Sequence, residues 1–310
     1  MLINMKNKLF FLIKILFTIL LILILISFIN LDELFGLLIK ANIWLLFIPI
    51  LLSPLATYIN SIRWKKIIDK FDKNFTILTL FKYYLISSFF NNFFPTSVGG
   101  DVYRLLKTKS NLASKKEIAI SILIERILGF LSIFIIILLV SPLFFQDIIN
   151  NKVLSFLILF SVMVCISFTG IFFLHRKIHY SKIKQLNKYK QLNKYIEAIK
   201  KIDDPLLILN SVIYSVIVMF MSVLAFWFIF LAFGYTINPL ILLFIIPAIG
   251  ISDMIPLTIN SIGIKEGIAI YLFSLFGFST ELILTVFILS RLLHIFASSF
   301  FGGLAYVYSN

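Results

Sequence analysis

The sequence predicts an all-helical protein that crosses a membrane several times, because it is strongly apolar, poor in charge and divided into long hydrophobic segments. Of its 310 residues, 61% are hydrophobic and 14% are charged, and the mean hydropathy is +1.05. Soluble domains carry about 25% charged residues and about 45–50% apolar residues. The composition therefore excludes a water-soluble protein and predicts a chain whose solvent is the lipid bilayer.

Six segments are long and apolar enough to cross about 30 Å of hydrocarbon as helices. The first lies within residues 1–30, which combine three lysines with an apolar stretch longer than that of a signal peptide and show no small-residue cleavage pattern. It is therefore expected to be retained in the mature protein as the first membrane helix. The six predicted spans are Leu9 to Asn30, Ile43 to Ile62, Ile118 to Phe144, Val153 to Leu174, Leu206 to Phe233 and Leu282 to Tyr306.

Two weaker apolar segments, Phe75 to Phe94 and Leu240 to Phe278, contain charged residues or end at proline. Basic residues precede and follow the first of them, and the positive-inside rule places both basic loops in the cytoplasm. This segment must then enter the membrane and return. Counting crossings from a cytoplasmic N-terminus predicts that the second segment enters and returns from outside. The basic loops are expected to contain Arg63, Lys65, Lys66, Lys70 and Lys73 in one case, and Arg104, Lys107, Lys109, Lys115 and Lys116 in the other.

The predicted architecture is one integral membrane domain over residues 1–310, with two halves of inverted topology, about 1–150 and 151–310. Each half has two spans, a re-entrant hairpin and a further span. Inverted repeats with broken helices near the midplane are typical of secondary transporters, and non-helical backbone is tolerated there where it lines a cavity. The hairpins are thus expected to mark the cavity of a multi-pass plasma-membrane protein with both termini in the cytoplasm.

The net charge of +14 suits either nucleic acid or an anionic membrane leaflet, and in so apolar a chain we expect the leaflet and no nucleic acid. The basic loop 175–204 contains the hexapeptide KQLNKY twice. It is expected to form either a helix on the leaflet or a solvated loop. Cys165 is the single cysteine, which excludes an intrachain disulfide and a cysteine-based metal site. The three tryptophans, Trp44, Trp64 and Trp227, are expected to include interfacial anchors.

The tips of the two hairpins share an order of residue types. A proline ends one helix, small polar residues and glycine form a turn, and acidic and basic residues follow in a first helical turn. Amides at such helix starts favour anions, and a basic side chain there can bind phosphate. The alternative is two structural bends with ion-paired flanks. The residues are Pro95, Gly99, Gly100, Asp101 and Arg104 in the first tip, and Pro256, Gly263, Lys265 and Glu266 in the second.

Three further charges are predicted close to the membrane midplane. Glu125 and Arg126 lie about nine residues beyond Lys116, hence about 14 Å into the membrane at 1.5 Å per residue. Arg291 lies about nine residues beyond Leu282, coming from the opposite face. Charges at this depth are costly unless paired or hydrated, and they indicate a functional site. The alternative is a buried ion network that only holds helices together.

Common catalytic motifs are missing from the sequence. It has no Walker A loop, GxGxxG, HExxH or GxSxG pattern, so neither ATP coupling nor a common hydrolytic site is visible. We therefore expect a protein that is not an enzyme and needs no metal or other cofactor.

Several strings of the sequence resemble a known family. FFPTSVGGDVYR at 93–104, ERILG at 125–129, IPLTINSIGIKEG at 255–267 and the late Arg291-Leu292 are similar to the transmembrane flippase-like domain of lysylphosphatidylglycerol synthases and its stand-alone relatives. In two-part members this domain moves aminoacylated phospholipid between leaflets, and a separate soluble domain transfers the amino acid. The chain ends at Asn310 directly after its last span, so the resemblance implies lipid translocation without lysyl transfer.

The resemblance and the charged residues together predict a flippase for a phosphate-bearing lipid, either a phospholipid or a polyprenyl-linked lipid, with an anionic or zwitterionic head group. Its phosphate would be read by Arg104, Arg126, Arg291 and Lys265, with Asp101, Glu125 and Glu266 as counter-charges or proton acceptors. Two alternatives stay open. One is an accessory subunit that presents lipid to a separate synthase or glycosyltransferase, and the other is an intramembrane lipid-modifying enzyme.

The predicted topology can be tested by cysteine accessibility after Cys165 has been replaced. Single cysteines at Ser110 and Asn187 should react only from the cytoplasm, and cysteines at Asn150 and Thr280 only from outside. Labelling of Ser110 from outside would contradict the re-entrant reading of Phe75 to Phe94, because this segment would then cross the membrane completely.

Overall fold

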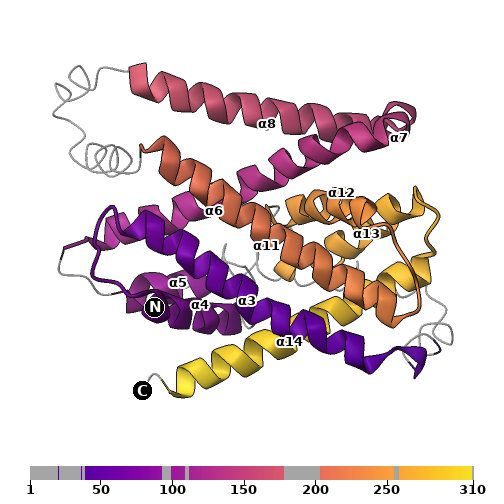
Figure 1. The fold of residues 1–310 in the computed structure, drawn as a ribbon, viewed down its shortest axis with the longest axis horizontal. Coiled ribbons are helices and arrows are strands. Elements are labelled where there is room, and N and C mark those ends of the chain that lie inside the picture. The colour runs from indigo at the N-terminus through magenta and orange to yellow at the C-terminus, as the bar shows by residue number, and fades with distance from the viewer. Residues whose placement is uncertain are drawn as a thin grey trace. The chain divides into compact units, whose positions relative to one another are not determined.

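The computed structural model describes residues 39–92, 99–108, 112–177, 203–254 and 258–308, together with Leu20 and Gly36. All regular elements in these ranges are helical, which confirms the predicted all-helical class (Figure 1). The α-helices are α3 (Ile43–Ile68), α4 (Ile77–Asn91), α5 (Gly99–Lys107), α6 (Lys115–Val140), α7 (Phe145–Asn150), α8 (Lys152–Lys177), α11 (Pro205–Ala232), α12 (Pro239–Gly250), α13 (Ile264–Ser274) and α14 (Thr280–Val307). Short 3-10 turns are η1 (Ser141–Phe144), η3 (Ile251–Met254) and η4 (Ile259–Ser261).

Five helical segments are long and apolar enough to cross a membrane, and they confirm five of the six predicted spans. They are Ile43–Ile68, Lys115–Asn150, Lys152–Gly170, Pro205–Ala232 and Thr280–Val307. The predicted first span, apart from Leu20, and most of the loop 175–204 lie outside the described residues. The chain is therefore a multi-pass membrane protein.

The two segments predicted as hairpins contain only short helices. Helix α4 has 15 residues, and α12 and α13 have 12 and 11, whereas about 20 are needed to cross a bilayer. Helices α12 and α13 pack against each other across η3 and η4. Pro95 and Pro256, expected to end the first helix of each hairpin, lie outside the described residues.

The chain forms two compact units that interleave along the sequence. Unit 1 comprises Met1–Leu55, Leu85–Gly100 and Met221–Asn310, and unit 2 comprises Ala56–Tyr84 and Asp101–Phe220. These units differ from the predicted halves 1–150 and 151–310, because α3, α4 and α11 each contribute residues to both. The inverted repeat stays a prediction.

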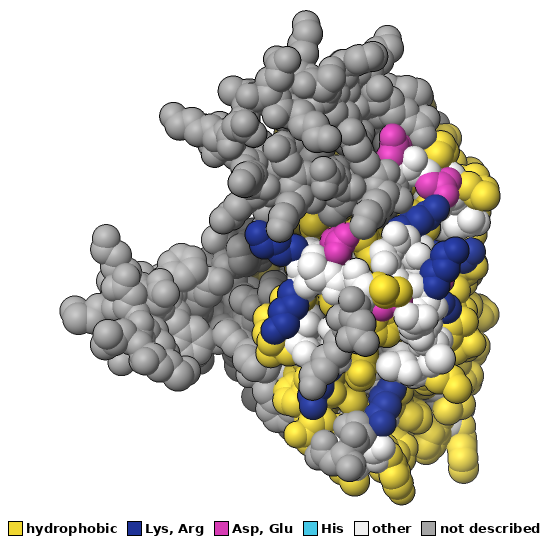
Figure 2. All heavy atoms as spheres, turned by 90° about the vertical axis from the view of Figure 1, so that its left-hand side faces the viewer, with side chains coloured by type: hydrophobic (Ala, Val, Ile, Leu, Met, Phe, Trp, Pro, Cys, Tyr) yellow, Lys and Arg dark blue, Asp and Glu magenta, His cyan; other side chains and the backbone are white. Residues whose placement is uncertain are grey.

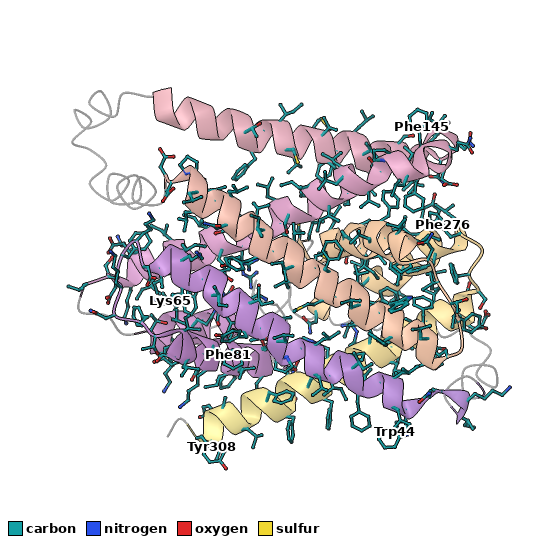
Figure 3. All side chains as sticks on the ribbon, in the orientation of Figure 1. Trp44, Lys65, Phe81, Phe145, Phe276 and Tyr308 are labelled. Atoms are coloured by element: carbon teal, nitrogen blue, oxygen red, sulfur yellow. The ribbon has the colours of Figure 1, made fainter. Side chains whose placement is uncertain are left out.

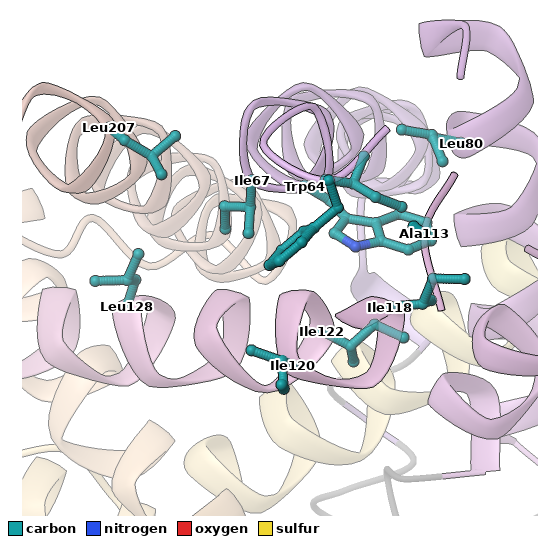
Figure 4. Close-up of a cluster of buried hydrophobic side chains, with 11 residues drawn as sticks. Trp64, Ile67, Leu80, Ala113, Ile118, Ile120, Ile122, Leu128 and Leu207 are labelled. Carbon is teal, nitrogen blue, oxygen red and sulfur yellow. The ribbon is translucent and has the colours of Figure 1, made fainter. Parts of the chain in front are cut away.

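Unit 2 is built on a hydrophobic cluster around Trp64 of α3, which is fully buried (Figure 4). Its indole Nε1 donates a hydrogen bond to Ser121 Oγ of α6 at 3.1 Å, which satisfies its one polar group. Trp64 is therefore a core residue and is not one of the interfacial anchors expected among the three tryptophans. Other members of the cluster are Ile67, Ile68, Phe71, Leu80, Ala113, Ile118, Ile120, Ile122, Leu128 and Leu207.

In unit 1, α14 packs closely against the second half of α4. Asn92 Nδ2 donates to Ser298 Oγ at 2.8 Å, and the rings of Phe90 and Tyr306 meet edge to face. A Cβ atom on Gly302 would overlap the carbonyl oxygen of Leu85 and approach Phe89 Cβ to 2.7 Å. This helix contact therefore depends on the absence of a side chain at Gly302, as in other close membrane helix pairs.

The exposed surface matches a bilayer and its boundary. Large apolar side chains are exposed along α3, α8, α11 and α14. Trp44, Phe145 and Tyr308 are exposed at helix ends, where aromatic residues prefer the membrane interface (Figure 3). Lys and Arg side chains gather on the face where α3 ends and α6 begins (Figure 2).

Two neighbouring glycines of α14 allow a matched test of this packing. Gly302→Ala should destabilise the protein by about 1–3 kcal/mol, because the added Cβ overpacks the contact with α4. Gly303→Ala should leave stability equal or slightly higher, since nothing lies within 4 Å of its Cβ position. Thermal unfolding of the purified protein in detergent measures both. Equal melting temperatures for the two variants would contradict the close contact.

Candidate functional site

A buried carboxylate on α6, Glu125, collects charged and polar side chains within unit 2. Its Oε1 accepts hydrogen bonds from Arg63 Nη2 at 2.8 Å and from the Tyr84 hydroxyl at 2.7 Å. Its Oε2 accepts from Arg104 Nη1 at 2.8 Å. We call these four residues the Glu125 cluster. They come from α3, α4, α5 and α6, so one carboxylate joins four helices.

Arg104 of α5 is enclosed as completely as its partner. The side chains of Arg104 and Glu125 are 2% and 1% exposed. The Arg104 guanidinium lies 4.7 Å from the Trp64 ring centroid and 4.2 Å from that of Tyr84, so aromatic faces stabilise the charge that water no longer reaches. Arg104 and Glu125, both predicted to meet the substrate, are thus sealed and engaged with each other.

Arg63 was missed as a site residue because it was expected in the loop after Ile62. That expectation is wrong, since α3 continues to Ile68 and Arg63 is buried within it. Its Nη1 donates to Ser215 Oγ of α11 at 2.6 Å. The guanidinium also passes beside Gly129 of α6, where an added Cβ atom would lie at ordinary contact distance, 3.4 Å, from Arg63 Nη1.

Asp101 and Arg126 form a second, more accessible contact of unit 2. The Arg126 Nε atom pairs with Asp101 Oδ2, and the two side chains are 30% and 14% exposed. Asp101 Oδ1 also accepts from Arg104 Nη2 at 2.5 Å. Arg126 therefore pairs with Asp101 in the first turn of α5, whereas its sequence neighbour Glu125 pairs with Arg104 further along the same helix.

Unit 1 carries its own charged group, which we call the Glu266 cluster, consisting of Asp253, Lys265, Glu266 and Arg291. Arg291 Nη2 donates to Glu266 Oε1 at 2.6 Å, and Arg291 Nη1 donates to the carbonyl of Asn260 at 3.1 Å. Lys265 Nζ pairs with Asp253 Oδ2 at 2.8 Å. The Arg291 side chain is 23% exposed and the Lys265 side chain 30%, so both cations are within reach of a ligand.

The backbone at the second tip is irregular where the sequence predicts a turn. Gly263 has φ +86°, and Asn260 and Ser261 have φ 53° and 57°. The Gly263 N–H donates to Glu266 Oε2 at 2.7 Å, which satisfies one free amide at the start of α13. The positive φ favours glycine at 263, as predicted.

At the first tip, glycine is required by close packing. Gly99 and Gly100 were expected to form the turn, but they are instead the first two residues of α5, and the Gly100 N–H donates to Asn91 Oδ1 at 2.7 Å. A Cβ atom on Gly100 would overlap the hydroxyl and carbonyl oxygens of Ser87. The start of α5 can approach α4 this closely because residue 100 has no side chain.

The described residues contain no group of three or more His, Cys, Asp or Glu side chains arranged to hold a metal ion. The Asp101–Arg126 pair and the Glu266 cluster offer accessible guanidinium and ammonium donors beside carboxylates. Such donors bind carboxylate or phosphate oxygens strongly, and arginine does so with two parallel hydrogen bonds.

Comparison with known proteins gives one family. The family model described as the lysylphosphatidylglycerol synthase TM region matches residues 11–302, which is nearly the whole chain. No curated protein and no solved structure shows a significant match to the chain.

Glu125 and Arg126 are neighbours on α6, but only Glu125 is fully buried, and this difference allows a test of their roles. Glu125→Gln should destabilise the protein by about 3–5 kcal/mol, because Arg63 and Arg104 would stay buried without their counter-charge. Arg126→Gln should cost much less, since its partner Asp101 keeps the bond to Arg104 and the site is accessible. Melting temperatures in detergent compare the two. A smaller loss for Glu125→Gln than for Arg126→Gln would contradict a structural role for the Glu125 cluster.

Proposed function

Because the chain belongs to the family of the lysylphosphatidylglycerol synthase TM region, we propose that it is a lipid translocase, which moves a phosphate-bearing lipid between the two leaflets of a membrane. On this proposal the protein acts by binding and release, and it is not an enzyme. The membrane is the plasma membrane, and the basic face of unit 2 and both termini lie on its cytoplasmic side.

The observation that carries the proposal is accessible charge midway along membrane-length helices. Arg291 is the twelfth residue of the 28-residue α14, and Arg126 is the twelfth of the 26-residue α6. At 1.5 Å per residue, both lie about 16 Å from the start of their helices. Charges at that depth cannot face hydrocarbon without a cost of several kcal/mol, so they require a counter-charge, water or a polar head group. Asp101 and Glu266 supply the counter-charge, and the exposed part of each arginine is left for water or a head group.

The chemistry of these side chains suits phosphate. A guanidinium offers a planar fork of donors to two phosphate oxygens, and Lys265 adds a compact positive charge. The carboxylates of Asp101, Asp253 and Glu266 keep each group nearly neutral in the absence of lipid. Arg104 and Glu125 have a different task in this proposal, which is to hold unit 2 together beneath the accessible pair.

Reconstitution into liposomes tests the function directly. Fluorescent phosphatidylglycerol, phosphatidylethanolamine and a polyprenyl phosphate are supplied in both leaflets, and the fraction quenched from outside reports exchange. The wild-type protein should accelerate exchange of at least one of them. Arg126→Gln and Arg291→Gln should each slow it about tenfold or more with little change in melting temperature, since loss of one charged hydrogen bond is worth about 1.5–3 kcal/mol.

Asp69→Asn is the control, because it breaks an ion pair outside the proposed site, between Lys65 in the last turn of α3 and Asp69 directly after that helix. It should exchange lipid at the wild-type rate. If the wild-type protein moves none of the three lipids, translocation is contradicted and the accessory-subunit alternative gains. Normal exchange by both arginine variants would remove these residues from the mechanism.

A further inference from the structure

The accessible acid–arginine pair occurs in both units at the same helical positions. Asp101 is the third residue of α5 and Glu266 the third of α13, whereas Arg126 and Arg291 are each the twelfth residue of the long helix that follows. In both units the acid and the arginine are 25 positions apart. The two acids, and likewise the two arginines, are separated by 165 positions.

The start of each long helix agrees with the same offset. Ser114 caps α6 and Ser279 caps α14, and these two residues are also 165 positions apart. Each serine side chain accepts a hydrogen bond from the backbone N–H three residues later. The match therefore includes the helix cap, the acid and the arginine.

The buried Arg104–Glu125 pair of unit 2 has no counterpart at the same offset in unit 1. With the offset of 165, Glu125 corresponds to Ser290 and Arg104 corresponds to Ala269. What the two units share is thus the accessible pair and the serine cap of the long helix, without the buried Arg104–Glu125 pair. A pair that only held helices together would be expected to keep the most buried partners, whereas a pair with a common task needs only its accessible arginine and the acid beside it.

In both units the acid divides its two oxygens in the same way. Asp101 uses Oδ1 for Arg104 on its own helix and Oδ2 for Arg126. Glu266 uses Oε2 for the Gly263 amide at its own helix start and Oε1 for Arg291. Each carboxylate would therefore keep a hydrogen bond if its arginine turned away, which lowers the cost of releasing the arginine.

The arginine is the more accessible partner in each pair. Arg126 is 30% exposed against 14% for Asp101, and Arg291 is 23% exposed against 6% for Glu266. An arriving anion would consequently meet the guanidinium before it meets the carboxylate. A carboxylate and a phosphodiester both carry one negative charge and present oxygens to the same fork of donors.

We propose that Asp101 and Glu266 are internal stand-ins for the lipid phosphate, each of which holds its arginine in the empty protein and is displaced when a head group binds. This inference rests on the proposed translocase function and adds a release step to it. The carboxylate competes with the phosphate, so it weakens lipid binding and lets the lipid leave after its passage. We call each such pair of a displaceable acid and its arginine a latch, and each unit carries one.

The latch makes an uncommon prediction, that removing an acid tightens binding of an anion. Asp101→Asn and Glu266→Gln should each bind dihexanoyl phosphatidylglycerol about tenfold more tightly than the wild-type full chain in detergent, and they should exchange fluorescent phosphatidylglycerol more slowly in liposomes. Both amides keep a carbonyl oxygen for the local hydrogen bond. The neutral dihexanoylglycerol should show no change in affinity.

The double variant Asp101→Asn with Arg126→Gln separates a latch from a general gain of positive charge. It should lose the tighter binding, because the gain acts through the arginine. Asp69→Asn removes an equal charge outside both pairs and should bind as the wild type does. If Asp101→Asn unfolds, Glu266→Gln in unit 1 provides the same measurement.

The outcomes distinguish this inference from the function on which it rests. Unchanged or weaker binding by both acid variants, with normal wild-type exchange, overturns the latch and leaves translocation standing. Tighter binding that persists in the double variant also overturns it. Tighter binding that needs the arginine, in a wild-type protein that exchanges no lipid, supports the latch and overturns translocation.

Discussion

A carboxylate shut away from water needs its negative charge balanced locally, and this requirement at Glu125 organises unit 2. Removing an ion from water costs several kcal/mol even after relaxation, and Arg63, Arg104 and Tyr84 offset this cost only by reaching the same point. Each arrives from a different helix. The charge therefore prescribes where the helices meet, and the Trp64 cluster fills the space around it. The pairing of Glu125 with these three side chains, more than apolar burial, distinguishes this arrangement from other packings of equally apolar helices.

The arginines of the two units differ in their contact with solvent, and with it in what they can bind. Arg104 has aromatic rings over its guanidinium and a carboxylate at its end, whereas Arg126 and Arg291 keep a fifth to a third of their side chain open. A buried arginine with all its partners in place cannot bind a ligand. Arg126 and Arg291 are held by carboxylates that each have a second hydrogen-bond partner. A sealed ion pair and an accessible one thus lie one residue apart on α6, at Glu125 and Arg126.

Hydropathy predicted five observed spans because lipid contact requires long apolar runs whatever the tertiary structure. It failed at Arg63, since a hydropathy window ends where charge begins although a helix can continue. The pairing of Glu125 depends on residues 62 and 21 positions away, and no local pattern indicates them. One feature could be predicted from the sequence. Successive residues on a helix point about 100° apart, so the side chains of Glu125 and Arg126 had to face different partners. The tip glycines were predictable as small residues, but the contact of Gly100 with Ser87 was not.

The two glycine contacts on α4 determine how closely the helices of unit 1 can pack. Gly100 lies against Ser87 at one place, and Gly302 lies against Leu85 and Phe89 at another, both at separations where no side-chain atom fits between the backbones. At both places, atoms of α4 occupy the position that a Cβ atom of the glycine would take. The start of α5 and the end of α14 can therefore lie this close to α4 only while residues 100 and 302 carry no side chain, and a larger residue at either position would force the backbones apart.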